Sequence, residues 1–256
     1  MMTTTALLEI LTAPELHPVR HGFFTRKGGA SSGVFAGLNC GGGSTDQTHA
    51  VRINRERVAA ALDLTVAALV SVHQVHSARV VTVTGPLDER PKADAMVTAT
   101  PGLALAILTA DCQPVLLADA GAGVIGAVHA GWRGALDGVL EATVDAMVAL
   151  GARRDSIAAA IGPTISQQAY EVGPEFLEQF IDTDPAYGRY FAQGQGDRAL
   201  FDLPGFGRDR LRAAGVENVR WTGNCTYGDP ERFFSYRRSV HRGEADYGRL
   251  VSAIRL

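Results

Sequence analysis

The sequence lacks any apolar run long enough to cross a membrane and any set of cysteines that would form a disulfide framework. A membrane helix needs about 18 to 20 consecutive apolar residues. The N-terminal segment, MMTTTALLEILTAPEL, has no positively charged start and carries Glu9 where a signal peptide would be apolar. Three cysteines, Cys40, Cys112 and Cys225, are odd in number and far apart, so at least one thiol is free for chemistry or metal binding. We therefore expect a cytoplasmic protein with no membrane partner.

The chain also lacks a strong charge of either sign. Its 24 Lys and Arg residues face 27 Asp and Glu residues, for a net charge of -3, which excludes a global attraction to nucleic acid or anionic lipid. The length of 256 residues, 46% of them hydrophobic, is enough to bury a large core. Because no internal repeat, low-complexity tract or long linker divides the chain, we predict a single domain over residues 1–256.

Apolar periodicity predicts a mixed α/β fold. Strands are expected at residues 67–73, 78–84, 94–98, 103–110, 114–119, 123–130, 157–163 and 218–222. Helices are expected at residues 134–150, 174–181 and 204–214, and after the glycine-rich segment 28–46, where Thr45 or Asp46 would cap the helix. Strands crowd together before helices alternate with them, so we expect a mixed or largely antiparallel sheet with helices outside it.

Three residues at or near the ends of apolar strands are candidate metal ligands: His76, Cys112 and His129. Two imidazoles and a thiolate suit zinc, and three protein ligands leave a fourth position for water or substrate. The spacings between them are much longer than in structural zinc modules. On spacing alone, buried hydrogen-bonded histidines and a buried thiol are the more frequent explanation of such residues.

Two neighbours of these residues compete with them for the site. On a strand, residues three apart point to opposite faces, so His73 or His76 could enter a given site but not both, whereas on a helix both could. Asp111 should face away from Cys112, either behind the ligands as their partner or as a cap of the strand end. Strand geometry leaves both questions open.

Local motifs along the chain identify a family. In order from about residue 20 to the C-terminus they are HGFFTRKGGASSGVFAGLNCG, VHQVHSARV, ADAMVT, LTADCQPVLL, GAVHAGWRG, AAIGPTISQQAYEVGPE and NCTYGDPERFFSYRR. Together they resemble the laccase-domain family, also called the multicopper polyphenol oxidase family, whose bacterial members include the peptidoglycan editing factor. One small departure is Tyr247-Gly248-Arg249, where the family commonly has Thr-Gly-Arg.

The resemblance implies a fold, a cofactor and an activity. The fold would be a single-domain α/β/β/α layered sandwich, and the metal would be zinc, with copper as the alternative, on His76, Cys112 and His129. The activity would be that of a purine nucleoside phosphorylase, with adenosine deamination and methylthioadenosine cleavage in related members. Purine nucleosides and phosphate would then be the partners, and a homodimer is a candidate assembly.

Phosphorolysis requires an anion site, a purine pocket and groups that move protons. The candidate phosphate-binding residues are Arg26, Asn39 and Arg133, and a helix starting near residue 134 would direct its positive end to the metal. Trp132 and Phe35 are candidate stacking surfaces for a purine, and Asp111 or Asp94 could shuttle a proton. His76, Cys112, His129 and Asp111 form the predicted catalytic set, in which a metal would orient phosphate or lower the pKa of bound water to roughly 7.

Three other functions fit parts of the pattern. A copper polyphenol oxidase would need more histidines than the chain can bring to one place. A thiol hydrolase that edits peptidoglycan precursors would use Cys112 as nucleophile and His129 as base, with no need for His76. A binding module with a structural zinc would need a fourth ligand, for which Cys40 and Cys225 are the candidates.

Overall fold

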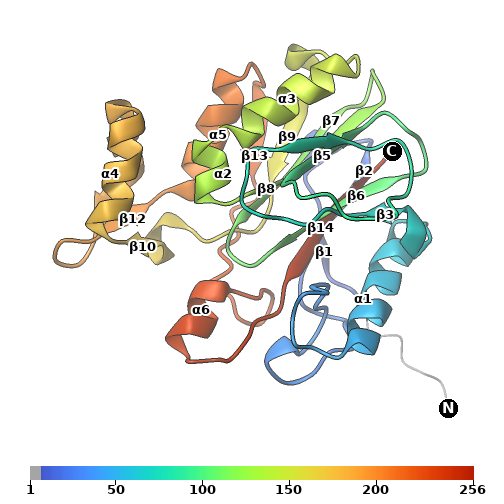
Figure 1. Ribbon diagram of the computed structural model, residues 1–256, viewed down its shortest axis with the longest axis horizontal. Helices are drawn as coiled ribbons and strands as arrows, with labels where there is room; N and C mark the ends of the chain where they lie inside the picture. Colours follow the sequence, from blue (N-terminus) through green and yellow to red (C-terminus); the bar gives the residue numbers. More distant parts are fainter. Residues whose placement is uncertain (1–6) are drawn as a thin grey trace.

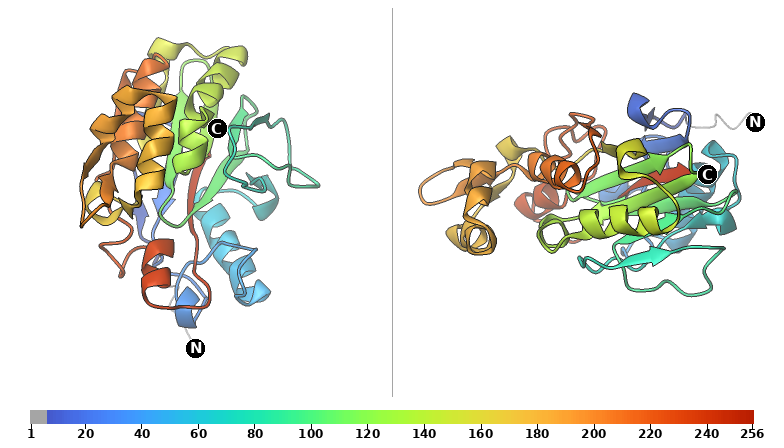
Figure 2. Two further views of the ribbon diagram at one scale, coloured as in Figure 1. Left: turned by 60° about the vertical axis from the view of Figure 1, so that its left-hand side comes forward. Right: turned by 90° about the horizontal axis from the view of Figure 1, so that it is seen from above.

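The computed structural model describes residues 7–256 and shows two β-sheets stacked face to face (Figures 1 and 2). One sheet has the strand order β1-β2-β14-β6-β3, with bounds Ile10–Leu11, Arg20–Phe24, Leu250–Arg255, Ala104–Thr109 and Leu69–Val70. The other has the order β13-β9-β7-β8-β5-β4, with bounds Asn218–Trp221, Ala158–Ile161, Gln113–Asp119, Val124–Ala130, Ala95–Thr98 and Val80–Thr82. Each sheet has parallel and antiparallel neighbours, so the predicted mixed sheet is confirmed.

Helices cover the outer faces of both sheets. Helix α1 (Thr48–Ala61) packs on the five-stranded sheet, while α2 (Trp132–Leu136), α3 (Val139–Ala149) and α5 (Leu203–Ala213) pack on the six-stranded sheet. Figure 1 shows these layers, with α3 above the strands and α1 below them. This is the α/β/β/α arrangement that the resemblance implied. No helix within residues 7–256 is both long and apolar enough to cross a bilayer.

Strand β6 shows why the sheets stack in this way. Its residues alternate in size: Leu105 and Ile107 are buried between the two sheets, and Ala104 and Ala106 face α1. Successive side chains of a strand point to opposite faces, so the large residues fill the space between the sheets. The alanines let the helix approach the other face closely.

A third, antiparallel sheet and α4 form an arm at the side of the sandwich (Figure 1, left). Its strands run in the order β10-β12-β11, with bounds Glu171–Val172, Ala199–Phe201 and Phe191–Gln193, and α4 spans Pro174–Thr183. A cluster of aromatic rings joins the arm to α5: Phe180 lies 4.7 Å from Phe201 and 5.3 Å from Phe206, centroid to centroid. The short helix α6 (Tyr236–His241) lies below the arm in Figure 1, and residues of both line one cavity. The sequence pattern predicted α4 but not the three strands of this sheet.

Three expected elements differ from the structure in length or continuity. The strand expected at 67–73 is reduced to the two residues of β3, and the one at 78–84 is reduced to β4. The helix expected at 134–150 is two helices, α2 and α3, separated at Gly138. Gly138 has φ +94°, a conformation open to glycine that cannot continue a right-handed helix. The apolar period runs through this break because both helices bury their apolar side against the same sheet.

The predicted cap of α1 was wrong. The helix begins at Thr48 after Gln47, and no side chain caps it. Thr45 instead bonds Asp246 through its backbone N–H and its hydroxyl, and Asp46 accepts a hydrogen bond from the side chain of Asn39. Both residues fix the glycine-rich loop rather than the helix.

Candidate metal centre

His76, Cys112 and His129 come together although they lie far apart in the sequence. One ligand atom from each lies within 4.8 Å of the other two. The Nε2 atom of His76 is 3.8 Å from the Sγ atom of Cys112, and the two imidazole rings are nearly perpendicular at 4.7 Å. Within residues 7–256 this is the one such convergence of three or more His, Cys, Asp or Glu side chains. The three residues could therefore hold one metal ion.

Strand register brings the three together. His129 lies in β8 opposite Pro114 of β7, so the turn that precedes β7 places Cys112 beside His129. On the other side of β8, the His129 backbone N–H donates to the carbonyl of Asp94, just before β5, at 2.7 Å. His76 lies in the loop that follows β3 and is not part of a strand. The alternation rule that set His73 against His76 therefore does not apply here.

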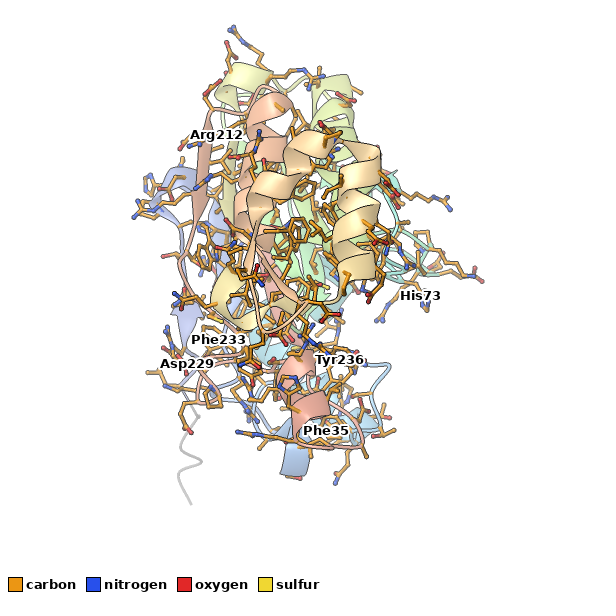
Figure 3. The ribbon with its side chains drawn as sticks, turned by 90° about the vertical axis from the view of Figure 1, so that its left-hand side faces the viewer. Phe35, His73, Arg212, Asp229, Phe233 and Tyr236 are labelled. Carbon is orange, nitrogen blue, oxygen red and sulfur yellow. The ribbon has the colours of Figure 1, made fainter. Side chains whose placement is uncertain are left out.

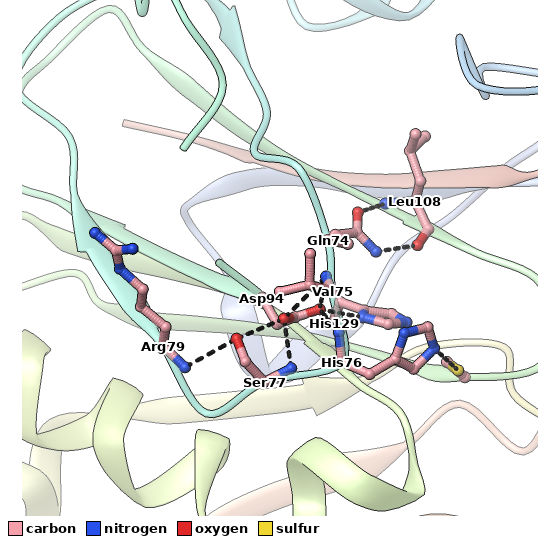
Figure 4. A network of polar contacts seen from close by, with 9 residues as sticks. Gln74, Val75, His76, Ser77, Arg79, Asp94, Leu108 and His129 are labelled. Atoms are coloured by element: carbon pink, nitrogen blue, oxygen red, sulfur yellow. Dashed lines mark hydrogen bonds and ion pairs between the residues drawn. The ribbon is translucent and has the colours of Figure 1, made fainter. Parts of the chain in front are cut away.

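The buried carboxylate of Asp94 holds the loop that carries His76. The backbone N–H groups of Val75, His76 and Ser77 all donate to it, at 2.6 to 3.2 Å, and the Ser77 hydroxyl does so at 2.8 Å (Figure 4). His76 has φ +61°, a left-handed conformation that is costly for any residue except glycine and persists when its surroundings fix it. The cluster of bonds on Asp94 supplies that restraint.

Asp94 also orients His129. The Nδ1 atom of His129 lies 2.8 Å from Oδ1 of Asp94, which leaves Nε2 free to face Cys112. Burial by itself would raise the pKa of the Asp94 carboxyl, but the hydrogen bonds from His129 and Ser77 outweigh it and hold that pKa well below its usual range. A carboxylate behind a histidine is common at zinc sites, because it fixes the tautomer and ring orientation of the ligand.

Cys112 and His129 polarise one another. Burial would raise the pKa of the Cys112 thiol, but the His129 charge and hydrogen bonds from both histidines lower it to about 6. Burial would likewise lower the pKa of His129, but the Cys112 thiolate and the bond to Asp94 raise it to about 9. Without a metal, thiolate and imidazolium therefore coexist between these two values. A thiolate at neutral pH is the form that binds zinc.

These shifts predict fast alkylation of Cys112 in metal-free protein. Iodoacetamide reacts with the thiolate, so the reaction rate should reach half its maximum near pH 6. At lower pH the rate should decrease further, because Cys112 takes up a proton. Mass spectrometry of the modified peptide across pH 5 to 9 measures this, and added zinc should protect the thiol. A rate that rises only near the ordinary thiol pKa of about 8.5 would contradict the thiolate–imidazolium pair.

The surroundings of the three residues suit a metal with an open coordination position. A Cβ atom on Gly131 would lie 3.0 Å from both the Cys112 sulfur and the His76 ring, so the glycine keeps this space clear. The two candidate fourth ligands lie elsewhere. Cys40 is fully buried beneath α1, where burial raises the pKa of its thiol to about 12, and Cys225 contacts Ser166. Among the described residues, the protein offers three ligands and no fourth from cysteine.

Two cavities meet at this group. The polar chamber, of about 320 Å³, is lined by residues 41–43 together with His73, Arg90, Thr109, Tyr247 and Arg249. The aromatic chamber, of about 510 Å³, is lined by Trp132, Tyr170, Phe176, Tyr236, Glu175 and Arg237. His76 and Cys112 line both chambers, so the candidate metal lies at their junction. Figure 3 shows Tyr236 at the end of α6 that faces the arm carrying α4.

Asp111 is held away from the ligands. Its Oδ1 atom accepts from the Thr226 hydroxyl, and its Oδ2 atom accepts from the Ser235 hydroxyl and the Arg237 backbone N–H. Its φ is +85°, and burial raises the pKa of its carboxyl above the usual value. The carboxylate ties the β6–β7 turn to the segment before α6. A direct role for Asp111 in proton transfer stays a prediction.

The other predicted site residues lie in different places. Trp132 lines the aromatic chamber and packs against Phe176, and its role as a stacking surface stays a prediction. Phe35 is buried in a 3₁₀ turn, Gly33–Phe35, outside both chambers. Arg133 is exposed with its guanidinium over the Trp132 ring. As expected, α2 starts beside the ligands, since Gly131 directly precedes it.

Arg26 and Asn39 serve the fold of the glycine-rich segment. Arg26 donates to the carbonyls of Ala36 and Pro230 and lines a third, smaller cavity. Asn39 is fully buried and bonds the loop from within. The residues that sequence reasoning missed are Arg90, Thr109 and Arg249. Arg249 stood in the Tyr-Gly-Arg segment and Thr109 in the motif LTADCQPVLL, but nothing in the pattern joined either residue to His76.

Comparison with known proteins gives one consistent result. Residues 20–256 match the model of a family described as multi-copper polyphenol oxidoreductase laccase. A protein of Deinococcus radiodurans named purine nucleoside phosphorylase is 45% identical over 91% of this chain and 88% of its own. The purine nucleoside phosphorylase YfiH of Escherichia coli is 39% identical over 86% and 88%. The crystal structure of NMB0706 from Neisseria meningitidis, 35% identical, superposes with a TM-score of 0.87 over 97% of this chain and 98% of that one.

Proposed function

The chain belongs to the multi-copper polyphenol oxidoreductase laccase family, and from that premise we propose that it is a zinc-dependent purine nucleoside phosphorylase. Relatives that are 39% and 45% identical over most of the chain carry that name. The observation that supports it most directly is the junction of two unlike cavities at His76 and Cys112. Phosphorolysis needs two unlike binding sites side by side, one for the phosphate anion and one for the uncharged nucleoside, because the two substrates react at one carbon atom of the sugar.

His76, Cys112 and His129 would hold the proposed zinc, which fits their donor chemistry and the open position beside Gly131. When bound there, the metal would supply a Lewis acid for a substrate oxygen. The chain's own groups do the rest. Asp94 keeps His129 in one tautomer, and the aromatic chamber binds the flat base between its rings and excludes water from it.

The proposed reaction replaces one bond at the sugar by another. A phosphate oxygen bonds to C1′ of the ribose, and the bond from C1′ to the purine nitrogen breaks. The base leaves with the bonding electron pair and takes up a proton, while the phosphate gives one up. The products are a free purine and ribose 1-phosphate. Methylthioadenosine, which differs at the 5′ position, would react in the same way. Deamination of adenosine would be a separate step, in which a water oxygen bonds to C6 of the purine and the C6–N bond breaks, giving inosine and ammonia.

A phosphate-dependent assay tests this function. Zinc-reconstituted protein is incubated with inosine or adenosine, with and without phosphate, and the products are separated by chromatography. We expect free base and ribose 1-phosphate in equal amounts only when phosphate is present, with ammonia released from adenosine as a separate product. Equal base release without phosphate would indicate a hydrolase, and no reaction with either nucleoside would contradict the proposal.

A thiol hydrolase is the second candidate, because Asp94, His129 and Cys112 form a chain of contacts like that of a catalytic triad. The placement of His76 against the Cys112 sulfur favours the metal instead, since a hydrolytic triad does not need it. A multi-copper oxidase has less support. Its cluster needs several metal ions, and the described residues offer a single group of ligands.

A further inference from the structure

The polar chamber carries an excess of positive charge. Arg90 and Arg249 line it together with three histidines, and none of the described residues that line it is acidic. Arg90 is exposed and forms no ion pair within residues 7–256. The nearest carboxylate to Arg249 is that of Asp246, at 3.9 Å, which is too long for a strong bond. The Arg249 guanidinium lies over the Tyr247 ring and donates one N–H to the Tyr247 carbonyl, which leaves its other N–H groups available. Both guanidinium groups can therefore bind an anion, a role for which their fork of N–H donors is suited.

Thr109 provides a second observation, independent of charge. Its side chain is 3% exposed and lines the polar chamber, yet its hydroxyl has no hydrogen-bond partner within the described residues. Buried hydroxyls are almost always bonded, and an unsatisfied one calls for a ligand or water. A hydroxyl donor beside two arginines suits an oxyanion.

The loop of residues 41–43 and Arg249 are held as one unit. The side-chain oxygen of Asn39 accepts from the backbone N–H of Gly41 at 3.0 Å and from that of Arg249 at 2.9 Å. A Cβ atom on Gly41 would lie 2.6 Å from Cδ of Arg249, so only glycine lets the arginine side chain cross the loop there. Asn39, expected to bind phosphate itself, thus positions a residue that can.

The aromatic chamber is the poorer place for an anion. Three of the residues that line it, Asp111, Glu171 and Glu175, are acidic. Its arginines lie beside Glu171: Arg237 donates to the Glu171 carbonyl, and Arg198 is 3.7 Å from the Glu171 carboxylate. Aromatic walls suit an uncharged base.

We propose that phosphate binds in the polar chamber on Arg90, Thr109 and Arg249, while the nucleoside occupies the aromatic chamber, so that the two meet beside His76 and Cys112. This assignment rests on the proposed phosphorolysis. It replaces Arg26 and Arg133 as the phosphate-binding arginines, because neither lines the polar chamber.

Three variants test the assignment: Arg249→Gln, Arg90→Gln and Thr109→Val. Each should raise the KM for phosphate, by about 10-fold or more for the arginines, which lose charged hydrogen bonds, and less for the threonine. The KM for inosine and the zinc content should change little. Titration of the zinc-loaded protein with inorganic phosphate, followed by calorimetry, should show the same loss of affinity without any turnover. Arg133→Gln is the matched control and should leave phosphate affinity unchanged.

The outcomes separate this inference from the proposed function. An active phosphorylase whose phosphate KM is unchanged in all three variants would overturn the assignment, as would an Arg133→Gln variant that loses phosphate affinity as strongly as Arg249→Gln. A protein without phosphorylase activity that still binds phosphate through Arg90 and Arg249 would remove the proposed function and support the anion site.

Discussion

Replacing Cys112 by alanine is expected to abolish phosphorolysis and to reduce bound zinc far below one ion per chain. The variant removes the only thiolate of the ligand group and leaves two imidazoles that hold zinc less tightly. A metal acting as a Lewis acid contributes several kcal/mol to a transition state, so turnover should fall by roughly 10³-fold or more. Elemental analysis and the phosphate-dependent assay, carried out on one preparation, measure both effects.

Cys225→Ala is the matched control for this experiment. Cys225 is also a partly exposed free thiol, but it contacts Ser166 and lies outside the ligand group, so its loss should spare zinc and turnover. His76→Ala separates the two candidate mechanisms. A metal enzyme should lose zinc and activity together in this variant, whereas a Cys112–His129 hydrolase should retain activity. A Cys112→Ala protein with full metal content and turnover would show that the site is misassigned.

Asp94→Asn is expected to damage both the ligand group and the fold. Asn has one acceptor oxygen in place of two, so at least one of the donors from residues 75–77 or His129 loses its partner. Losing charged hydrogen bonds at a fully buried carboxylate should lower the free energy of unfolding by roughly 3 kcal/mol. His129 loses the partner that fixes its tautomer, which typically costs about 10- to 100-fold in metal affinity.

Denaturant unfolding of the metal-free protein and competition with a zinc chelator measure the two effects separately. Asp119→Asn is the control, since Asp119 is also buried and accepts backbone N–H groups, those of Ala122 and Arg153, far from the ligands along β7. It should lose stability without losing metal affinity. If Asp94→Asn binds zinc as tightly as the unmodified protein, the orienting role of Asp94 would be wrong.

Much of the fold could be predicted because its central strands are strongly patterned. The expected strands at 94–98, 103–110, 114–119 and 123–130 correspond closely to β5 through β8, which are apolar on both faces because each lies within the sandwich. Shorter elements were less predictable. Strand β3 consists of only Leu69 and Val70. The chain then leaves the sheet, because the backbone N–H groups of residues 75–77 bond to the Asp94 carboxylate.

The candidate ligand residues could be named from the sequence, but the hydrogen-bond partners of the polar groups around them could not. Strand ends and family motifs pointed to His76, Cys112 and His129. Asp111, adjacent to Cys112, looked equally suited to proton transfer. Its carboxylate instead accepts hydrogen bonds from Thr226, Ser235 and Arg237. Those partners follow Asp111 by more than a hundred residues, and no local pattern predicts such a contact.

The sequence by itself determined the layered α/β architecture, the family and the three side chains suited to a metal, because periodicity and short motifs are local properties. Only the tertiary structure decided which histidine of the 73–76 segment joins the group, where two cavities meet, and which arginines line the cavity beside the three candidate ligands. Arg90 and Arg249 are separated by most of the chain and share a chamber only because both sheets and the glycine loop close around it. Charge in a cavity depends on distances in space, and these exist only once the chain has folded.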